Sequence, residues 1–324
     1  MKLSPFHYHA PISLSECAQL LQSYGDEAAI VAGGTELFVR MKLGLVKKRH
    51  LISLSAVRGI DAISTDRKGA LILGAGTTLS VLAGSPLVRR SAPALAESAS
   101  LVATTQVRNM ATVGGNILQE TRCSYYDRSA VWRKAVAACF KRGGDLCHVV
   151  PKGKKCFAVY QGDLAPVLIA LGSAAILFRD SKEEEVPLEA LFTGEGKSPF
   201  RKREQPLLAR VRIPPSQKGG HAAYRKYRLR NGMDFPLAGV AVRIDRRAGK
   251  VEDLRVCLTG VSSSPVIVSK ASGLARGKGL TAELTGLIAE AAYRAAHPVD
   301  NLEVSSSRRK GMVRLMTGEM LAAM

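Results

Sequence analysis

The sequence has few aromatic residues, and it lacks the patterns of several common protein classes. Phe, Trp and Tyr make up 5% of its 324 residues, while Ala, Leu, Val and Gly carry the apolar content, as is typical of soluble α/β or α+β proteins. Residues 1–19 contain no continuous apolar stretch that a secretory signal needs. The longest apolar run, residues 164–178, is interrupted by Pro166 and Gly172 and is too short to cross a bilayer. We therefore expect a cytoplasmic protein with no membrane partner.

Acidic residues are the scarcer charge, with 27 Asp and Glu against 47 Lys and Arg and a formal net charge of +20. The basic residues are spread from Arg40 to Arg314, and no RNA-binding or helix-turn-helix pattern organises them. Affinity for a phosphate backbone needs clustered cations rather than a high total, so we expect no nucleic-acid partner. The excess charge instead favours electrostatic steering of an acidic partner protein.

The sequence has no Cys-x-x-Cys pair, although it contains six cysteines. This absence excludes the usual zinc-ribbon and bacterial ferredoxin patterns, which depend on that pair. Four cysteines nevertheless fall within residues 122–157, namely Cys123, Cys139, Cys147 and Cys156. In a reducing compartment such a group is more typical of a metal site than of disulfides. The residues alone leave zinc, an iron–sulfur cluster and unligated thiols open, whereas Cys17 and Cys257 are predicted to be buried in the core.

Two glycine loops are predicted to bind a phosphorylated ligand. Gly33, Gly34 and Thr35 follow an expected strand, and Thr112, Gly114, Gly115 and Asn116 form a second site. Paired glycines allow backbone N–H groups to approach a ligand closely, and a hydroxyl adds a further donor. Neither loop has the lysine of a P-loop or the three-glycine spacing of a dinucleotide fold. Together the loops predict a long ligand with phosphates and a polar tail, held mainly by the main chain.

The two loops resemble those of the FAD-binding subunits of the molybdenum hydroxylase family, which includes xanthine dehydrogenase and carbon monoxide dehydrogenase. The resemblance is carried by AGGTEL at residues 32–37 and RNMATVGGNI at residues 108–117, and it covers most of the chain. It implies that both loops hold the FAD diphosphate. In the family an Asp-Pro segment follows the second loop, and GDLAPVLIAL with Asp163 is the matching segment here.

Residues 122–157 separate the second glycine loop from that segment and are interpreted as an insertion. The segments TRCSYYD and CFKRGGDLCHV resemble segments of the β subunit of 4-hydroxybenzoyl-CoA reductase, in which an insertion binds a [4Fe-4S] cluster. The resemblance implies that the four clustered cysteines are the ligands, with His148 outside the ligand set. Nearby cations would favour the more reduced state of such a cluster, and burial would oppose this. The candidate cations are Lys134, Lys141, Arg142, Lys152, Lys154 and Lys155.

The resemblance also implies an α+β organisation. We expect a two-part FAD-binding domain over residues 1–213 with the cysteine insertion at about 122–157, and a smaller α+β domain over residues 214–324. In the family the opening segment of the second domain helps to hold the flavin. The predicted cofactor-binding residues are Ala32, Gly33, Gly34, Thr35, Glu36, Thr112, Gly114, Gly115, Asn116, Asp163, Tyr224, Lys226 and Asp234.

Local patterns predict several helices. Apolar residues at helical spacing behind a serine predict a helix over residues 14–24, ended by a glycine. The acidic run before an apolar run predicts that a short helix starts within residues 182–192. Helical spacing also predicts a helix that begins at the Thr281 cap and stops before Pro298.

The function implied by the resemblance is electron transfer rather than substrate chemistry, so no catalytic residue is expected in this chain. The expected partners are a molybdenum-cofactor subunit, a [2Fe-2S] subunit, and ferredoxin or another acidic electron carrier. The implied reaction is reductive removal of an aromatic hydroxyl. Two alternatives remain: a FAD subunit of another molybdenum hydroxylase that passes electrons from substrate to an acceptor, and a zinc-stabilised basic binding module.

Overall fold

A computed structural model describes residues 3–201, 207–217 and 219–324. It begins with a parallel sheet in the order β1-β3-β2. The strands are β1 (His7–His9), β2 (Ala28–Val31) and β3 (His50–Ser53). Helix α1 (Leu14–Tyr24) connects β1 to β2 and has the bounds that the sequence predicts. The Ser13 hydroxyl accepts the N–H of Glu16 at its start, and Gly25 ends it with a φ of +48°.

The second sheet is antiparallel, in the order β4-β5-β8-β6-β7. Its strands are β4 (Ile63–Thr65), β5 (Leu71–Gly74), β6 (Ala174–Arg179), β7 (Lys182–Pro187) and β8 (Leu207–Ile213). The helix predicted to start within residues 182–192 is wrong for its first half. These residues pair with β6, and the side chains of Glu183 and Glu185 form ion pairs with Arg210 and Arg212 of β8. The hairpin with β6, together with these ion pairs that reach over β6 to β8, thus favours a strand here.

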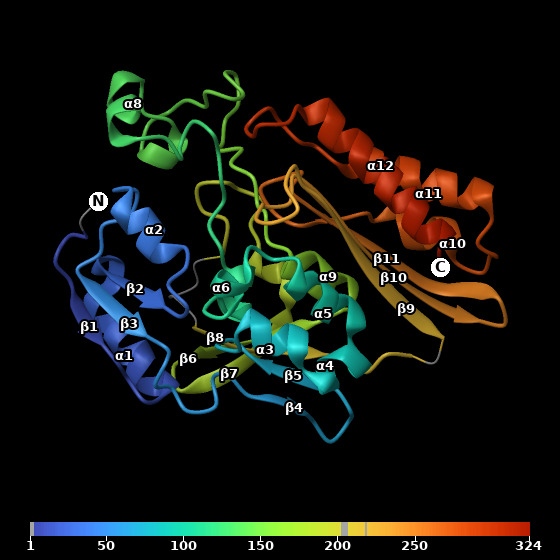
Figure 1. Cartoon of the computed structure of the whole chain (residues 1–324), viewed down its shortest axis with the longest axis horizontal. Helices are drawn as coiled ribbons and strands as arrows, with labels where there is room; N and C mark the ends of the chain where they lie inside the picture. The colour runs from blue at the N-terminus through green and yellow to red at the C-terminus, as the bar shows by residue number, and fades with distance from the viewer. Residues whose placement is uncertain (1–2, 202–206, 218) are drawn as a thin grey trace.

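Short helices surround this sheet and form one core with it (Figure 1). They are α3 (Leu79–Gly84), α4 (Pro86–Ser91), α5 (Pro93–Ser100), α7 (Val113–Ile117) and α9 (Leu164–Ala170), whereas the short helix α6 (Thr105–Arg108) contributes no buried residue. Every residue of α9 is buried, which explains the continuous apolar run there. None of the helices in the described part of the chain is long and apolar enough to span a membrane.

A third, antiparallel sheet in the order β12-β11-β10-β9 forms the C-terminal part. Its strands are β9 (Gly220–Tyr227), β10 (Ala238–Arg247), β11 (Lys250–Thr259) and β12 (Val266–Ile267). Val240, Val242 and Ile244 point to one face and pack on the C-terminal helices, whereas Ala241 belongs to the first core. Those helices are α10 (Lys270–Ala275), α11 (Ala282–Ala295) and α12 (Ser306–Ala322). The Thr281 cap of α11 agrees with the sequence prediction.

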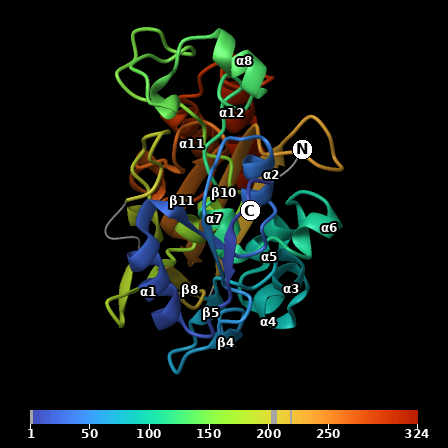
Figure 2. The ribbon, with the colours of Figure 1, turned by 90° about the vertical axis from the view of Figure 1, so that its left-hand side faces the viewer.

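The cysteine segment projects away from these layers. Its helix α8 (Ala130–Ala135) lies at the end of the molecule opposite β4 in both views (Figures 1 and 2). The segment leaves and rejoins the body through a two-stranded bridge between Arg122 and Val159. Asn301, which precedes α12, contacts both ends of the cysteine segment. Its backbone carbonyl accepts the N–H of Ser124, and its side-chain amide donates to the Phe157 carbonyl.

Candidate functional site

The first glycine loop connects β2 to α2 (Leu37–Lys42). A Cβ at Gly33 would lie 1.8 Å from the carbonyl oxygen of Met110, so glycine is needed for the two loops to approach this closely. Gly34 has a φ of +68°. The backbone N–H groups of Gly33, Gly34 and Thr35 have no acceptor among the described residues. This loop therefore presents free donors suited to a diphosphate.

The second glycine loop differs, because its donors are already used. The N–H of Gly115 donates to the hydroxyl of Thr112 at 3.1 Å, and the N–H of Gly114 donates to the Ala75 carbonyl at 2.8 Å. A Cβ at Gly114 would lie 3.0 Å from that of Ala75. In the structure both N–H groups are thus paired within the chain and Gly114 permits close packing, while the role of this loop in holding the diphosphate stays a prediction.

Asn116 supports the neighbouring segment. Its side-chain oxygen accepts the N–H of Leu164 at 3.0 Å and so aligns the start of α9. The Tyr160 hydroxyl donates to the Ile117 carbonyl at 2.8 Å and ties the same two segments together. Nearby, the amide nitrogen of Gln119 is buried and has no acceptor within the described residues. Because an unpaired buried donor costs about 1–3 kcal/mol, it is the kind of atom that a bound ligand satisfies.

Asp163, Tyr224 and Lys226 form a closed group between the two parts of the chain. Lys226 Nζ lies 3.1 Å from one Asp163 oxygen, and the Tyr224 hydroxyl donates to the other at 2.8 Å. Burial raises the pKa of Asp163 and lowers that of Lys226, and their contact opposes both shifts. Lys226 also donates to the Leu101 carbonyl at 3.1 Å. These side chains, predicted as flavin contacts, are paired with one another in the structure.

Asp234 lies in the loop that follows β9. Its carboxylate accepts the backbone N–H of Arg230 at 3.4 Å and lies 3.7 Å from the guanidinium of the same arginine. The next residue, Phe235, has its ring 3.7 Å from the Arg122 guanidinium. The loop thus packs on the start of the cysteine segment, while Asp234 itself closes the loop.

The four clustered cysteines line one pocket. Cys139 opens a turn in which the N–H of Phe140 donates to the Leu146 carbonyl at 2.9 Å. A Cβ at Gly144 would lie 1.8 Å from the Ala138 carbonyl oxygen, so this glycine permits the turn. The remaining lining is largely aromatic and aliphatic, with one lysine and one histidine. The lining residues are Cys123, Cys139, Cys147 and Cys156 with Tyr125, Tyr126, Phe140, Lys141, Leu146, His148, Val149, Phe157 and Ala158. Cys17 and Cys257 are buried in the first core, as predicted.

Burial affects the chemistry of these thiols. It raises the pKa of Cys156 to about 11, although the Ala158 N–H, which approaches the sulfur at 3.4 Å, and Lys141 act in the opposite direction. Burial also raises the pKa of Cys123. Both thiols therefore carry a proton at neutral pH unless a metal displaces it.

The donor set indicates the kind of metal centre. Thiolates alone suit zinc, copper(I) or an iron–sulfur cluster. Across the described ranges, no three His, Cys, Asp or Glu side chains are arranged to hold a single metal ion. A zinc site would need its sulfurs at about 2.3 Å from one point. Four cysteines that line one pocket provide enough thiolates to ligate an iron–sulfur cluster.

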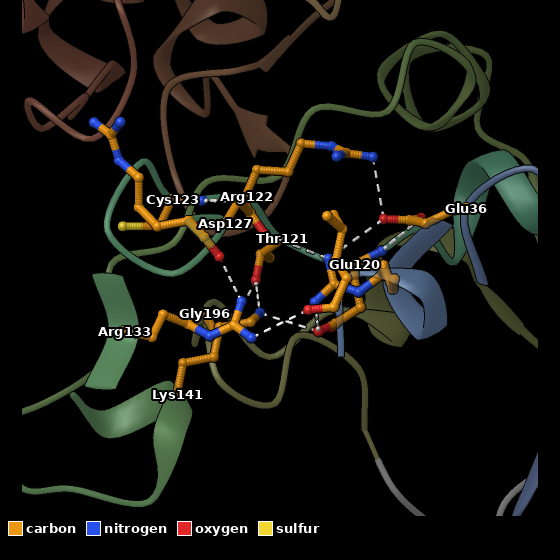
Figure 3. A network of polar contacts seen from close by, with 12 residues as sticks. Glu36, Glu120, Thr121, Arg122, Cys123, Asp127, Arg133, Lys141 and Gly196 are labelled. Carbon is orange, nitrogen blue, oxygen red and sulfur yellow. Dashed lines mark hydrogen bonds and ion pairs between the residues drawn. The ribbon is translucent and has the colours of Figure 1, made fainter. Parts of the chain in front are cut away.

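A partly buried polar network connects the pocket to the first glycine loop (Figure 3). The Glu36 carboxylate lies 3.1 Å from the Arg122 guanidinium and accepts the Glu120 N–H at 3.3 Å. Burial raises the pKa of Glu36, and Arg122 and Arg40 oppose that shift. Glu120 in turn lies 3.5 Å from Arg40 and 3.1 Å from Lys141. Glu36, predicted as a cofactor residue, is therefore the link between the loop and the insertion.

Sequence reasoning did not single out Arg40, Glu120 or Arg122. Arg40 and Glu120 are 80 residues apart, and no local pattern marks them as neighbours. Lys141 was one of six candidate cations, and only burial separates it from the exposed lysines.

Two family models match the chain, one after the other. The family model of the FAD binding domain in molybdopterin dehydrogenase matches residues 4–216. The model of the CO dehydrogenase flavoprotein C-terminal domain matches residues 222–324. These matches account for the α+β fold expected from the sequence, and they decide against the alternative of a zinc-stabilised binding module.

Individual relatives agree. The carbon monoxide dehydrogenase medium chain of Hydrogenophaga pseudoflava is 28% identical over 321 residues, 98% of this chain and 96% of the relative. The aldehyde oxidoreductase FAD-binding subunit of Escherichia coli (strain K12) is 32% identical over 247 residues, 74% of this chain and 76% of the relative. A solved structure of the Hydrogenophaga pseudoflava enzyme superposes with a TM-score of 0.82 at 26% identity, covering 98% of this chain and 96% of that one. The chain belongs to the family of FAD-binding oxidoreductase subunits of the molybdenum hydroxylases.

Proposed function

We propose that the chain is the FAD- and [4Fe-4S]-carrying electron-transfer subunit of a molybdenum-containing reductase of the 4-hydroxybenzoyl-CoA reductase type. The observation that carries the proposal is the pocket lined by four thiols in a segment inserted after the second glycine loop. The flavin-binding domain comprises residues 1–213 and the C-terminal domain residues 214–324. The complex is cytoplasmic, and it contains a molybdenum-cofactor subunit and a [2Fe-2S] subunit. An acidic carrier such as ferredoxin supplies the electrons.

The chain's own residues bind and position the two groups. Gly33, Gly34 and Thr35 donate their N–H groups to the FAD diphosphate, and Gln119 offers a further donor. The four cysteines replace their protons with iron. When bound, FAD and the cluster supply one-electron exchange between the donor and the partner subunits. The substrate's aromatic hydroxyl is removed on the molybdenum subunit, so this chain contributes no catalytic residue.

A second candidate has the same cofactors and the opposite direction of electron flow. Relatives named carbon monoxide dehydrogenase and xanthine dehydrogenase favour it, because they are named for oxidations. Reconstitution with the partner subunits distinguishes the two candidates. The proposed function requires turnover driven by reduced ferredoxin, and the second requires turnover with an oxidant and a reduced substrate.

A cysteine variant tests the cluster assignment. We expect Cys139→Ser to lose the iron–sulfur EPR signal and ferredoxin-driven turnover while retaining FAD, because the pocket and the glycine loops are built from different residues. Cys17→Ala is the matched control, since this thiol lies in the core and outside the pocket. Retention of the full signal in Cys139→Ser would contradict the proposal.

A further inference from the structure

Lys141 is the one buried cation in the lining of the cysteine pocket. Its side chain is 4% exposed. Its ammonium donates to the Gly196 carbonyl at 2.8 Å and to the Thr121 hydroxyl, and it lies 5.3 Å from the centre of the Tyr126 ring. These contacts fix the charge in one place beside the thiols.

The charge of Lys141 is only partly balanced. Among the described carboxylates, Glu120 alone lies within 4 Å of the ammonium, at 3.1 Å. The Glu120 side chain is 36% exposed and is shared with Arg40, so solvent weakens its field more than that of the buried lysine. The positive charge of Lys141 is therefore only partly offset on the side that faces the pocket.

The other cations of the insertion are placed differently. Lys134, Lys152, Lys154 and Lys155 are exposed, and dissolved salt screens exposed charges. The Arg142 side chain donates to the Arg133 carbonyl and is not part of the pocket lining. Burial in the pocket lining thus distinguishes Lys141 from the other candidate cations, from which the sequence alone does not separate it.

We infer that Lys141 sets the reduction potential of the metal centre in the cysteine pocket, by holding a buried positive charge beside Cys156. Reduction adds one electron from the external donor to a centre that already carries negative charge. A fixed cation stabilises that added negative charge and raises the reduction potential, provided that the cation is not screened by solvent. The inference rests on the proposed iron–sulfur cluster and names a residue that tunes it.

Redox titration of the full chain, followed by EPR, tests the inference with three variants. In Lys141→Gln the ratio of reduced to oxidised cluster at a fixed ambient potential should fall about tenfold, equivalent to about 59 mV for one electron. Lys141→Arg keeps the charge and should stay close to the wild type. Lys155→Gln removes an exposed charge next to Cys156 and is the matched control, for which we expect no change at physiological salt.

Glu120→Gln supplies a shift of opposite sign. It removes the carboxylate that partly balances Lys141, so the reduced fraction should rise, and a merely structural role of the network does not predict opposite signs. This variant decides the question if Lys141→Gln fails to take up iron. Unchanged or same-direction potentials would overturn the inference and leave the cluster in place. A wild-type chain without iron would instead overturn the proposed function, and the inference with it.

Discussion

Lys141 and Lys226 are both buried, and each lies 3.1 Å from one carboxylate oxygen. Their partners differ. Asp163 is 3% exposed and also accepts the Tyr224 hydroxyl, so the Lys226 group is closed. Glu120 is 36% exposed, so the Lys141 group is open on one side. Each lysine thus contacts one carboxylate at the same distance, but the carboxylate neutralises the ammonium of Lys226 more completely than that of Lys141.

The difference separates an ion pair that joins two parts of the chain from one to which we assign an effect on the proposed metal centre. The closed group joins the N-terminal body to β9 and leaves no net charge, as a contact between domains requires. The open group leaves positive charge beside four thiols that must become negative to bind metal. Burial of a lysine therefore says little about its role until the exposure of its partner is known.

The largest effect should come from breaking the closed pair. Lys226→Met leaves Asp163 buried without its cation, so the free energy of unfolding should fall by about 3–5 kcal/mol. Urea unfolding followed by circular dichroism measures the change. The double variant Lys226→Met/Asp163→Asn should recover much of the loss, because no unpaired charge remains. A loss below about 1 kcal/mol in the single variant would show that this ion pair does not stabilise the contact between the two parts of the chain.

Metal removal should loosen the cysteine insertion beside the Lys141–Glu120 pair and leave the rest of the chain unchanged. After chelation, the proton-bearing thiols no longer hold the insertion together, and trypsin should cleave at Lys134, Lys152, Lys154 or Lys155 about tenfold faster. Mass spectrometry of the fragments locates the cuts. Cleavage elsewhere in the chain serves as the internal control and should keep its rate. Equal rates with and without metal in the insertion would contradict a stabilising metal centre.

The smallest effect is a pH dependence of stability that arises in the N-terminal sheet, where histidine side chains contact one another. His9 Nε2 lies 3.0 Å from His50 Nδ1, and His7 stacks on His50 at 5.2 Å. Desolvation and these two histidines lower the pKa of His50, while Glu27 opposes the shift and Arg49 adds to it. A lowered pKa of a base means that protonation favours the unfolded chain.

Stability should therefore be complete above the ordinary histidine pKa of about 6.5 and decline as the pH falls below it. The midpoint of thermal unfolding between pH 7.5 and 5.5 measures this decline. His50→Phe keeps a ring against Tyr24, whose ring lies 3.7 Å away, and should make the profile flatter. An identical pH profile in the variant would remove the histidine cluster as its cause.

The sequence predicted those parts of the molecule that depend on local pattern. Helix α1 and the cap of α11 follow from apolar spacing and capping residues, and the clustered cysteines do meet in one pocket. The acidic run of β7 was misassigned because its partners, Arg210 and Arg212, lie on a strand more than 20 residues away. Charge pairing across a sheet leaves no helical or alternating mark in the sequence.

The two glycine loops show the same limit. Both have paired glycines and a threonine, yet within the described chain the glycine N–H groups stay free in the first loop and are paired in the second. Ala75 takes the donor of Gly114, and this contact depends on how β5 packs against α7. Likewise the partner of Lys141 is set by tertiary structure. A sequence identifies which groups are present, whereas their availability is decided by packing.

Iron and acid-labile sulfide analysis of the purified full chain, normalised to FAD, tests whether the insertion holds a [4Fe-4S] cluster. We expect about four iron and four sulfide for each flavin, because the pocket offers one cysteine for each iron of such a cluster. A chain that contains FAD with zinc, or with no metal at all, would contradict it.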